Sequence, residues 1–260
     1  MKPTLAVAGL TLALCTMTFA QDTSGDRIVV PAATGGRPRV VNCNLLNGTI
    51  TVKTHASGEV IVEGESHYHE EHQGGMHRIG VSTNGMEAVV DDNVITVHNR
   101  NGNGSVTITV PVNTSLKLHT LSGGVNVEGV NGEVEVHTSN GQVHLNNISG
   151  TVTADSQNGE IKVSMDRVDP SKPLAFSTLN GMVDLTLPAD VKADLTVKSN
   201  HGAVYSDFDV TLGGSRAIRE RNGSSYQIRM DNTIRGTING GGVDLTIHTL
   251  NGAVYIRKKK

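Results

Sequence analysis

Short runs of alternating apolar and polar residues fill most of the chain, and they repeat at a fixed spacing. Between Leu118 and Gly159, glycine recurs every nine residues, at Gly123, Gly132, Gly141, Gly150 and Gly159. A β-branched apolar residue stands two positions after each of these glycines: Val125, Val134, Val143, Val152 and Ile161. Nine residues hold one strand of about five or six residues and one tight turn. The pattern therefore predicts short strands, each with one buried face.

A longer repeat of eighteen residues is superimposed on the first. It reads Thr120-Leu121-Ser122-Gly123, then Thr138-Ser139-Asn140-Gly141, then Ser156-Gln157-Asn158-Gly159. Self-similarity at a fixed period is typical of solenoids, whose coils stack at the inter-strand spacing of about 4.8 Å. We therefore predict an all-β fold: a parallel β-solenoid (β-helix) of roughly nine-residue strand-turn units, two per coil.

The alternation also predicts which side chains point into this solenoid. They are Val125, Val127, Val134, Val136, Val143, Leu145, Val152 and Ile161. At the turns, glycine is expected to supply backbone conformations with positive φ. Equivalent asparagines are expected to hydrogen-bond along the stack: Asn140, Asn158, Asn180 and Asn251. A second ladder of hydroxyls is expected from Thr120, Thr138, Ser156, Thr178, Ser199 and Thr249.

The start of the chain has the pattern of a secretory signal. Lys2 is followed by the apolar stretch Leu5 to Leu14, and Thr18-Phe19-Ala20 offers a cleavage site before Gln21. We therefore expect residues 1–20 to be a signal peptide, 21–39 a flexible leader, and 40–260 a single β-solenoid domain. Two loops are expected to interrupt that domain, a His-rich insertion at 66–80 and a Gly-, Ser- and Arg-rich loop at 213–225. The apolar run from Leu5 to Leu14 is too short for a membrane-spanning helix, and no other stretch is long and apolar enough to form one.

Three stretches of the repeat are distinctive: ITVPVNTSLKLHTLSGGVNVEGVNG, LTLPAD at Leu185 to Asp190, and the closing GGGVDLTIHTLNGAVYIRK. Together with the repeated T-x-N-G-x-V units they resemble a bacterial adhesin-like family of β-strand-repeat proteins, a domain of unknown function. The resemblance covers roughly Val40 to Lys258. It implies a parallel β-solenoid in the cell envelope with no established chemistry. The His-rich segment from Ser66 to His77 departs from the family pattern.

The composition fits a solenoid better than a globular core. Aromatic residues make up 3% of the chain and tryptophan is absent, whereas a solenoid buries small aliphatic side chains between coils. Beyond the signal, Cys43 is the only cysteine, so no internal disulfide is expected. We expect Cys43 to be a small buried residue beside Val41 and Leu45.

Charge is distributed unevenly along the chain. Residues 21–210 contain twelve Lys/Arg and twenty-two Asp/Glu, whereas residues 211–260 contain nine and three and end in Arg257-Lys258-Lys259-Lys260. The basic end would either keep a terminal edge strand from pairing further or attract anionic envelope polymers or the acidic end of another molecule. Nucleic-acid binding fits neither the export signal nor the acidic body.

The densest group of metal-ligating residues lies in the His-rich insertion. His67, His69, His72 and His77, with Glu70 and Glu71, crowd eleven residues, and imidazole and carboxylate suit Zn²⁺ or Cu²⁺. The string His69-Glu70-Glu71-His72 is one residue short of the zinc-protease motif and sits in a polar loop, so a metalloprotease is rejected. The remaining alternatives are a divalent-metal site with no catalysis and a solvated loop that binds nothing.

Two weaker groups of polar residues follow from the repeat. His119, His137 and Asp155 occupy equivalent outward positions on successive coils and are expected to form one column. Asp166, Arg167 and Asp169 share one loop, which would suit a polysaccharide-active enzyme, but such enzymes usually present aromatic platforms to sugar rings, and rings are scarce here.

The sequence thus predicts a non-enzymatic, exported cell-envelope protein with an adhesin-like structural or interaction role. Metal binding through the His-rich loop is the alternative, and a polysaccharide-active enzyme is a weaker one. The expected location is periplasmic, cell-surface or secreted. Expected partners are an envelope protein or an anionic polymer, with no cofactor other than Zn or Cu in the insertion and no nucleic acid.

Overall fold

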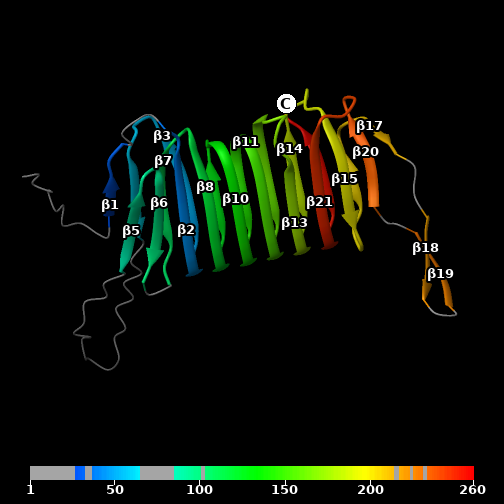
Figure 1. The fold of residues 1–260 in the computed structure, drawn as a ribbon, viewed down its shortest axis with the longest axis horizontal. Helices are drawn as coiled ribbons and strands as arrows, with labels where there is room; N and C mark the ends of the chain where they lie inside the picture. The colour runs from blue at the N-terminus through cyan, green and yellow to red at the C-terminus, as the bar shows by residue number, and fades with distance from the viewer. Residues whose placement is uncertain are drawn as a thin grey trace, which may run out of the picture.

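The computed structural model describes residues 27–32, 37–64, 85–100, 103–213, 217–222, 225–230 and 233–260. Within these ranges every regular element is a β-strand, which confirms the all-β prediction. The predicted signal peptide, most of the predicted leader and the His-rich insertion lie outside the described residues. Figure 1 shows the strands standing side by side along the long axis of the molecule.

The strands form two hydrogen-bonded ladders that face each other across the core. In spatial order, the first ladder contains β5 (Met86–Asp91), β6 (Val94–Asn99), β2 (Arg39–Asn47), β8 (Thr114–Ser122), β10 (Asn131–Asn140), the second part of β11 (Val143–Asn158), β13 (Leu174–Asn180), β21 (Val243–Asn251), β15 (Ala193–Ser199), β20 (Thr233–Ile238) and β17 (Val210–Leu212).

The second ladder contains β1 (Arg27–Val30), β4 (Val60–Gly64), β7 (Val106–Pro111), β3 (Ile50–His55), β9 (Val125–Glu128), the first part of β11, β12 (Ile161–Val168), β14 (Val183–Leu187), β22 (Val254–Lys258) and β16 (Val204–Ser206). A separate hairpin pairs β18 (Ala217–Asn222) with β19 (Ser225–Met230). The two ladders are continuous through β11, which changes register around Ile148 where Asn147 has a φ of 54°.

The eighteen-residue repeat sets the register in the middle of the molecule. Val134 pairs with Val152 on one side and with Leu116 on the other, each eighteen residues away, and these pairings are parallel. Both ends differ from the prediction of parallel pairing throughout. The pairs β1–β4, β4–β7 and β5–β6 are antiparallel at one end, and β15–β20 and β17–β20 are antiparallel at the other.

The spatial order of the repeat units also departs from their order in the chain. The unit β2–β3 lies between β6–β7 and β8–β9. The last unit, β21–β22, is inserted between β13–β14 and β15–β16. The reading of the basic end as a guard on an edge strand is therefore wrong, because β22 has a neighbour on both sides.

The core lies between the ladders and is built from small aliphatic side chains. All eight residues predicted to point inward are at most 1% exposed. Cys43 is buried between Val41 and Leu45 of the same strand, as predicted, and desolvation raises the pKa of its thiol to about 12. Among the described residues, Phe176 on β13 is the largest fully buried side chain. Alternation with a period of two thus places one apolar face of each strand inward.

Turn glycines stack on one another down the molecule. A Cβ added to Gly141 would overlap the carbonyl oxygen of Gly123, and one added to Gly159 would overlap that of Gly141. Positive φ was the expected reason for these glycines, and it holds at Gly123 (153°) and Gly48 (135°) but not at Gly141 or Gly159. Glycine recurs at the latter turns because successive backbones approach too closely for any side chain.

The polar residues beside these glycines join neighbouring units. The predicted asparagine ladder is present, with Nδ2 to Oδ1 distances of 2.9, 2.8 and 2.7 Å along Asn140, Asn158, Asn180 and Asn251. The hydroxyls do not form the expected ladder with one another. Each donates instead to a glycine carbonyl, as Thr138 does to Gly123 at 3.2 Å and Ser156 to Gly141 at 3.1 Å.

Candidate functional site

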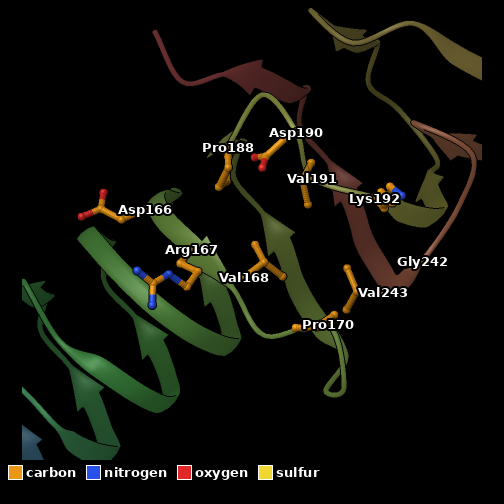
Figure 2. Close-up of a pocket in the computed structure, with 10 residues that line it drawn as sticks. All are labelled: Asp166, Arg167, Val168, Pro170, Pro188, Asp190, Val191, Lys192, Gly242 and Val243. Carbon is orange, nitrogen blue, oxygen red and sulfur yellow. The ribbon is translucent and has the colours of Figure 1, made fainter.

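A cleft of about 430 Å³ opens where three connections between strands meet at one end of the ladders (Figure 2). These connections run from β12 to β13, from β14 to β15 and from β20 to β21. The lining residues are Asp166, Arg167, Val168, Pro170, Pro188, Asp190, Val191, Lys192, Gly242 and Val243. Segments more than seventy residues apart in the sequence therefore share one site.

Hydrogen bonds hold the connection from β14 to β15 in place. The Val191 amide donates to the Pro188 carbonyl at 3.1 Å and closes a turn. The side-chain amide of Asn239 donates to the Val191 carbonyl at 2.7 Å, and the Val243 amide donates to the Lys192 carbonyl at 3.0 Å. These bonds tie two walls of the cleft together, so its shape is set before any ligand arrives.

The connection from β12 to β13 is fixed by Asp169. Its backbone amide donates to the Gly150 carbonyl at 2.8 Å, and its Oδ1 accepts hydrogen bonds from the amide and hydroxyl of Ser171 at 2.9 and 2.6 Å. These two bonds lower the pKa of the Asp169 carboxyl. Asp169 therefore shapes its own loop, whereas Asp166 and Arg167, from the same predicted group, line the cleft.

The cleft has an apolar floor and charges of both signs at its rim. Val191 and Val243 are buried and Val168 is half-buried, and Figure 2 shows these three side chains around the hollow. Exposed Asp166 and Arg167 lie on one side, and exposed Asp190 and Lys192 on the other. Such a site offers apolar contact together with charged hydrogen-bonding groups.

Ion pairs within the chain partly neutralise the basic end. Lys259 pairs with Asp166 at the rim of the cleft, and its Nζ also lies 3.3 Å from Oδ1 of Asn147. Arg257 contacts Oδ1 of Asp184 through its Nε at 2.8 Å. The basic end thus binds the acidic body of the same chain.

The arrangement of the cleft suits binding better than hydrolysis. Glycoside hydrolysis uses a carboxylic acid held protonated by an apolar environment opposite a second carboxylate. Both aspartates that line this cleft are exposed, and Asp166 is already paired with Lys259. Neither aspartate of this cleft is therefore a buried acid of the kind that glycoside hydrolysis uses.

The predicted column of His119, His137 and Asp155 is present on the outer surface of the first ladder, where the three residues pair directly in register. Beside this column, His137 Nε2 lies 3.1 Å from Glu135 Oε1, and Lys117 Nζ lies 3.3 Å from Glu135 Oε2. These partners, His137 foremost, lower the pKa of Glu135.

Among the described residues, no group of three or more His, Cys, Asp or Glu could hold a metal ion. The residues predicted as metal ligands, His67, His69, His72 and His77, lie outside the described ranges. The structure therefore does not test the metal-binding alternative.

Sequence reasoning missed most of the cleft. Leu185 to Asp190 stood out only as part of a family pattern, and nothing in the sequence placed it beside Gly242 and Val243. The available signal was the break in the repeat at Pro170 and Pro188, since proline marks irregular connections and functional residues often lie on such loops.

Comparisons with known proteins identify the family of this chain. Within the described part of the chain, no helical segment has the length and apolar character needed to cross a bilayer. The chain has no match among curated proteins. A crystal structure of a proposed cell adhesion protein from Clostridium sporogenes aligns with 91% of this chain and 100% of its own, at 10% identity and a TM-score of 0.37. The family model described as Toastrack DUF4097 matches residues 28–257. Since that match spans most of the sequence, the chain belongs to the Toastrack DUF4097 family.

Proposed function

We propose that this protein is an exported, non-enzymatic component of the cell envelope with an adhesin-like interaction role. The signal-like segment at residues 1–20 supports export to the periplasm, the cell surface or the medium. The single observation that carries the interaction role is the preformed cleft with an apolar floor and a rim of both charges.

We also propose that the fold is a β-solenoid in the sense of repeated coils. One coil consists of one strand in each ladder, and the parallel eighteen-residue register from β8 to β12 supports this description. The antiparallel strands at both ends then act as caps, which solenoids need because an open last coil would expose an unpaired edge. A rigid stack of this kind holds its loops, and therefore the cleft, in a fixed geometry.

The charges of the cleft favour an envelope protein over an anionic polymer as the partner. An anionic polymer would be bound best by cations alone, but Asp166 and Asp190 stand beside Arg167 and Lys192. A protein segment can place an apolar side chain on the floor near Val191 and present charges of both signs to the rim. We therefore propose a protein partner at the cleft.

Site-specific photo-crosslinking in intact cells tests this proposal. A photo-reactive amino acid at position 190, on the exposed rim, should yield one defined crosslinked envelope protein. The matched control is position 198, because Lys198 is also exposed and lies on β15 (Ala193–Ser199), on the outer surface of the first ladder. Equal crosslinking at both positions, or none at position 190, would contradict a specific partner at the cleft.

The alternative function, metal binding through the His-rich insertion, rests on one sequence observation. Four of the eleven histidines fall between His67 and His77. Calorimetry with Zn²⁺ and Cu²⁺ should show heat that disappears in a variant with His67→Ala, His69→Ala and His72→Ala. Identical heats from both proteins would contradict metal binding by these histidines and would favour the alternative of a solvated loop that binds nothing.

A further inference from the structure

Two tyrosines stack on the outer surface at the end of the second ladder. Tyr205 on β16 (Val204–Ser206) pairs in register with Tyr255 on β22 (Val254–Lys258). Their ring centroids are 5.1 Å apart and the ring planes differ by 12°. Tyr205 is 53% exposed, and β16 has no partner among the described strands other than β22. The face of the Tyr205 ring turned away from Tyr255 is therefore not covered by another described strand.

Polar groups surround this pair. A hollow of about 250 Å³ is lined by Tyr205, Ser206, Asp207, Tyr255, Ile256 and Arg257. The Arg257 guanidinium lies 5.0 Å from the centroid of the Tyr255 ring, and Asp184 anchors it through the 2.8 Å contact to Nε. The Ser206 hydroxyl donates to the Phe208 carbonyl at 3.1 Å, which fixes the chain as it leaves β16. The rings and the charged groups are thus held in place.

The topology creates this pair from two distant copies of one motif. His201-Gly202-Ala203-Val204-Tyr205 and Asn251-Gly252-Ala253-Val254-Tyr255 are equivalent in the repeat. No tyrosine occupies the equivalent position in the earlier units, which carry Thr51, Asn126, His144, Lys162 and Asp184. Only the insertion of β22 beside β16 brings the two tyrosines together, although they are fifty residues apart.

A purely structural role does not account for this group. Aromatic side chains stabilise a protein mainly through the surface that they bury, but here one ring is half exposed. The chain contains four tyrosines and no tryptophan, and the only aromatic residues in the core of the described part are Phe176 and Phe208. Two of those four tyrosines lie outward and together, beside an exposed carboxylate and an anchored guanidinium.

We propose that Tyr205, Tyr255 and Asp207 form a binding site for a pyranose ring of a glycan. A pyranose has an apolar face of C–H groups and an edge of hydroxyls. The apolar face would stack on the open face of Tyr205, which Tyr255 supports from behind, and the hydroxyls would donate to the Asp207 carboxylate. Binding is non-covalent and involves no reaction.

Other ligands fit this hollow less well. An extended peptide that added to β16 would find only three residues of strand to pair with, which gives few main-chain hydrogen bonds. A nucleic acid would bring phosphates close to Asp184 and Asp207, which repel them. This hollow shares no lining residue with the cleft. A negative result for the glycan site would therefore not bear on the protein partner proposed for the cleft.

Binding of cellohexaose and chitohexaose to the purified chain tests the site. We expect saturable binding by saturation-transfer NMR, with Tyr205→Ala weakening it about tenfold, since base or ring stacking on an aromatic side chain contributes that much. Tyr205→Phe should retain binding because it keeps the ring. The matched control is Leu212→Ala, which removes an exposed apolar side chain of β17 that is outside the hollow.

Each outcome decides the proposal. Retained binding in Tyr205→Phe and Leu212→Ala with loss in Tyr205→Ala would support it, provided that the three variants unfold at the same urea concentration. Failure of both glycans to bind, or equal weakening by Leu212→Ala, would overturn it. Binding of an extended peptide that neither glycan displaces would also overturn it and would assign the edge of β16 to peptides.

Discussion

Asn158 donates its side-chain amide to the side-chain carbonyl of Asn140, eighteen residues earlier, at an Nδ2 to Oδ1 distance of 2.9 Å. The Asn158 carbonyl in turn accepts from Asn180 at 2.8 Å. Asn158 is therefore an interior member of a ladder that crosses from unit to unit, as in stacked amides of fibrillar sheets. The ladder hydrogen-bonds each of these turns to the next, so it couples successive units.

Replacing this interior asparagine should destabilise the protein more than replacing the end of the ladder. Asn158→Ala removes two hydrogen bonds and should lower the free energy of unfolding by about 1 to 3 kcal/mol. Asn251→Ala removes the single 2.7 Å bond to Asn180 and should cost about half as much. Urea unfolding followed by circular dichroism measures both. The control is exposed Gln157→Ala, and an equal midpoint for Asn158→Ala and Gln157→Ala would show that the ladder adds nothing.

A pair of glycine variants separates close packing from backbone conformation. Gly141 lacks a positive φ, but a methyl group there would overlap the Gly123 carbonyl, so Gly141→Ala should cost about 3 kcal/mol of stability. Gly240 has a φ of 87° with open space around its Cβ position, so Gly240→Ala should cost only the conformational strain of about 1 to 2 kcal/mol. The same urea unfolding experiment ranks them. The opposite order would mean that turn conformation, and not stacking, selects glycine.

The period of the sequence repeat predicted the strand register within the central units. It predicted little of the order in which the units lie side by side. The eighteen-residue repeat predicted both partners of Val134, because strands of equivalent pattern stack in register. It also predicted Val143 as one partner of Val125, but not the other partner, Ile50. The same similarity leaves the neighbours of each unit undetermined, since any unit can pair with any other. Paired residues of β21 and β13 are seventy-one positions apart in the sequence, and those of β21 and β15 are fifty apart. Neither spacing is a multiple of the repeat, so the repeat does not predict these pairings. The cleft and the tyrosine pair both depend on that insertion, so neither could be predicted.

The inward face of β11 should not tolerate a charge. Val143→Asp places a carboxylate at a fully buried position without a partner, and we expect it to destabilise the fold by more than about 4 kcal/mol or to prevent folding. The matched control is His144→Asp, on the half-buried outer surface of the same strand, with an expected cost of about 1 kcal/mol or less. Thermal unfolding compares them. Similar melting temperatures for the two variants would contradict the assignment of the core face.

Cys43 should react with thiol reagents only when the protein unfolds. Its side chain is 1% exposed, and desolvation raises its pKa to about 12, so the reactive thiolate is scarce at neutral pH. In protein that begins at Gln21 it is the only thiol, which makes the reaction with Ellman's reagent specific. We expect slow labelling in buffer and complete labelling in urea. Rapid labelling in buffer would show that the first ladder opens at β2.

Stability should depend on pH through Glu135. Contacts with His137 and Lys117 lower the pKa of Glu135 from its ordinary value of 4.5, so the folded state binds this proton less readily than the unfolded state. The resulting stabilisation is fully present above pH 4.5 and is lost as the pH falls through the lower folded value. Glu135→Gln should therefore be less stable than the parent at pH 6 and equal to it at the acid end of the range. Because the side chain is 36% exposed, solvent screens the interaction and the difference should be small.

Repeating the comparison in a His137→Gln background should shrink the difference, since His137 is the main cause of the shift. A stability difference that is the same at every pH would attribute the effect of Glu135→Gln to packing and would remove the electrostatic explanation.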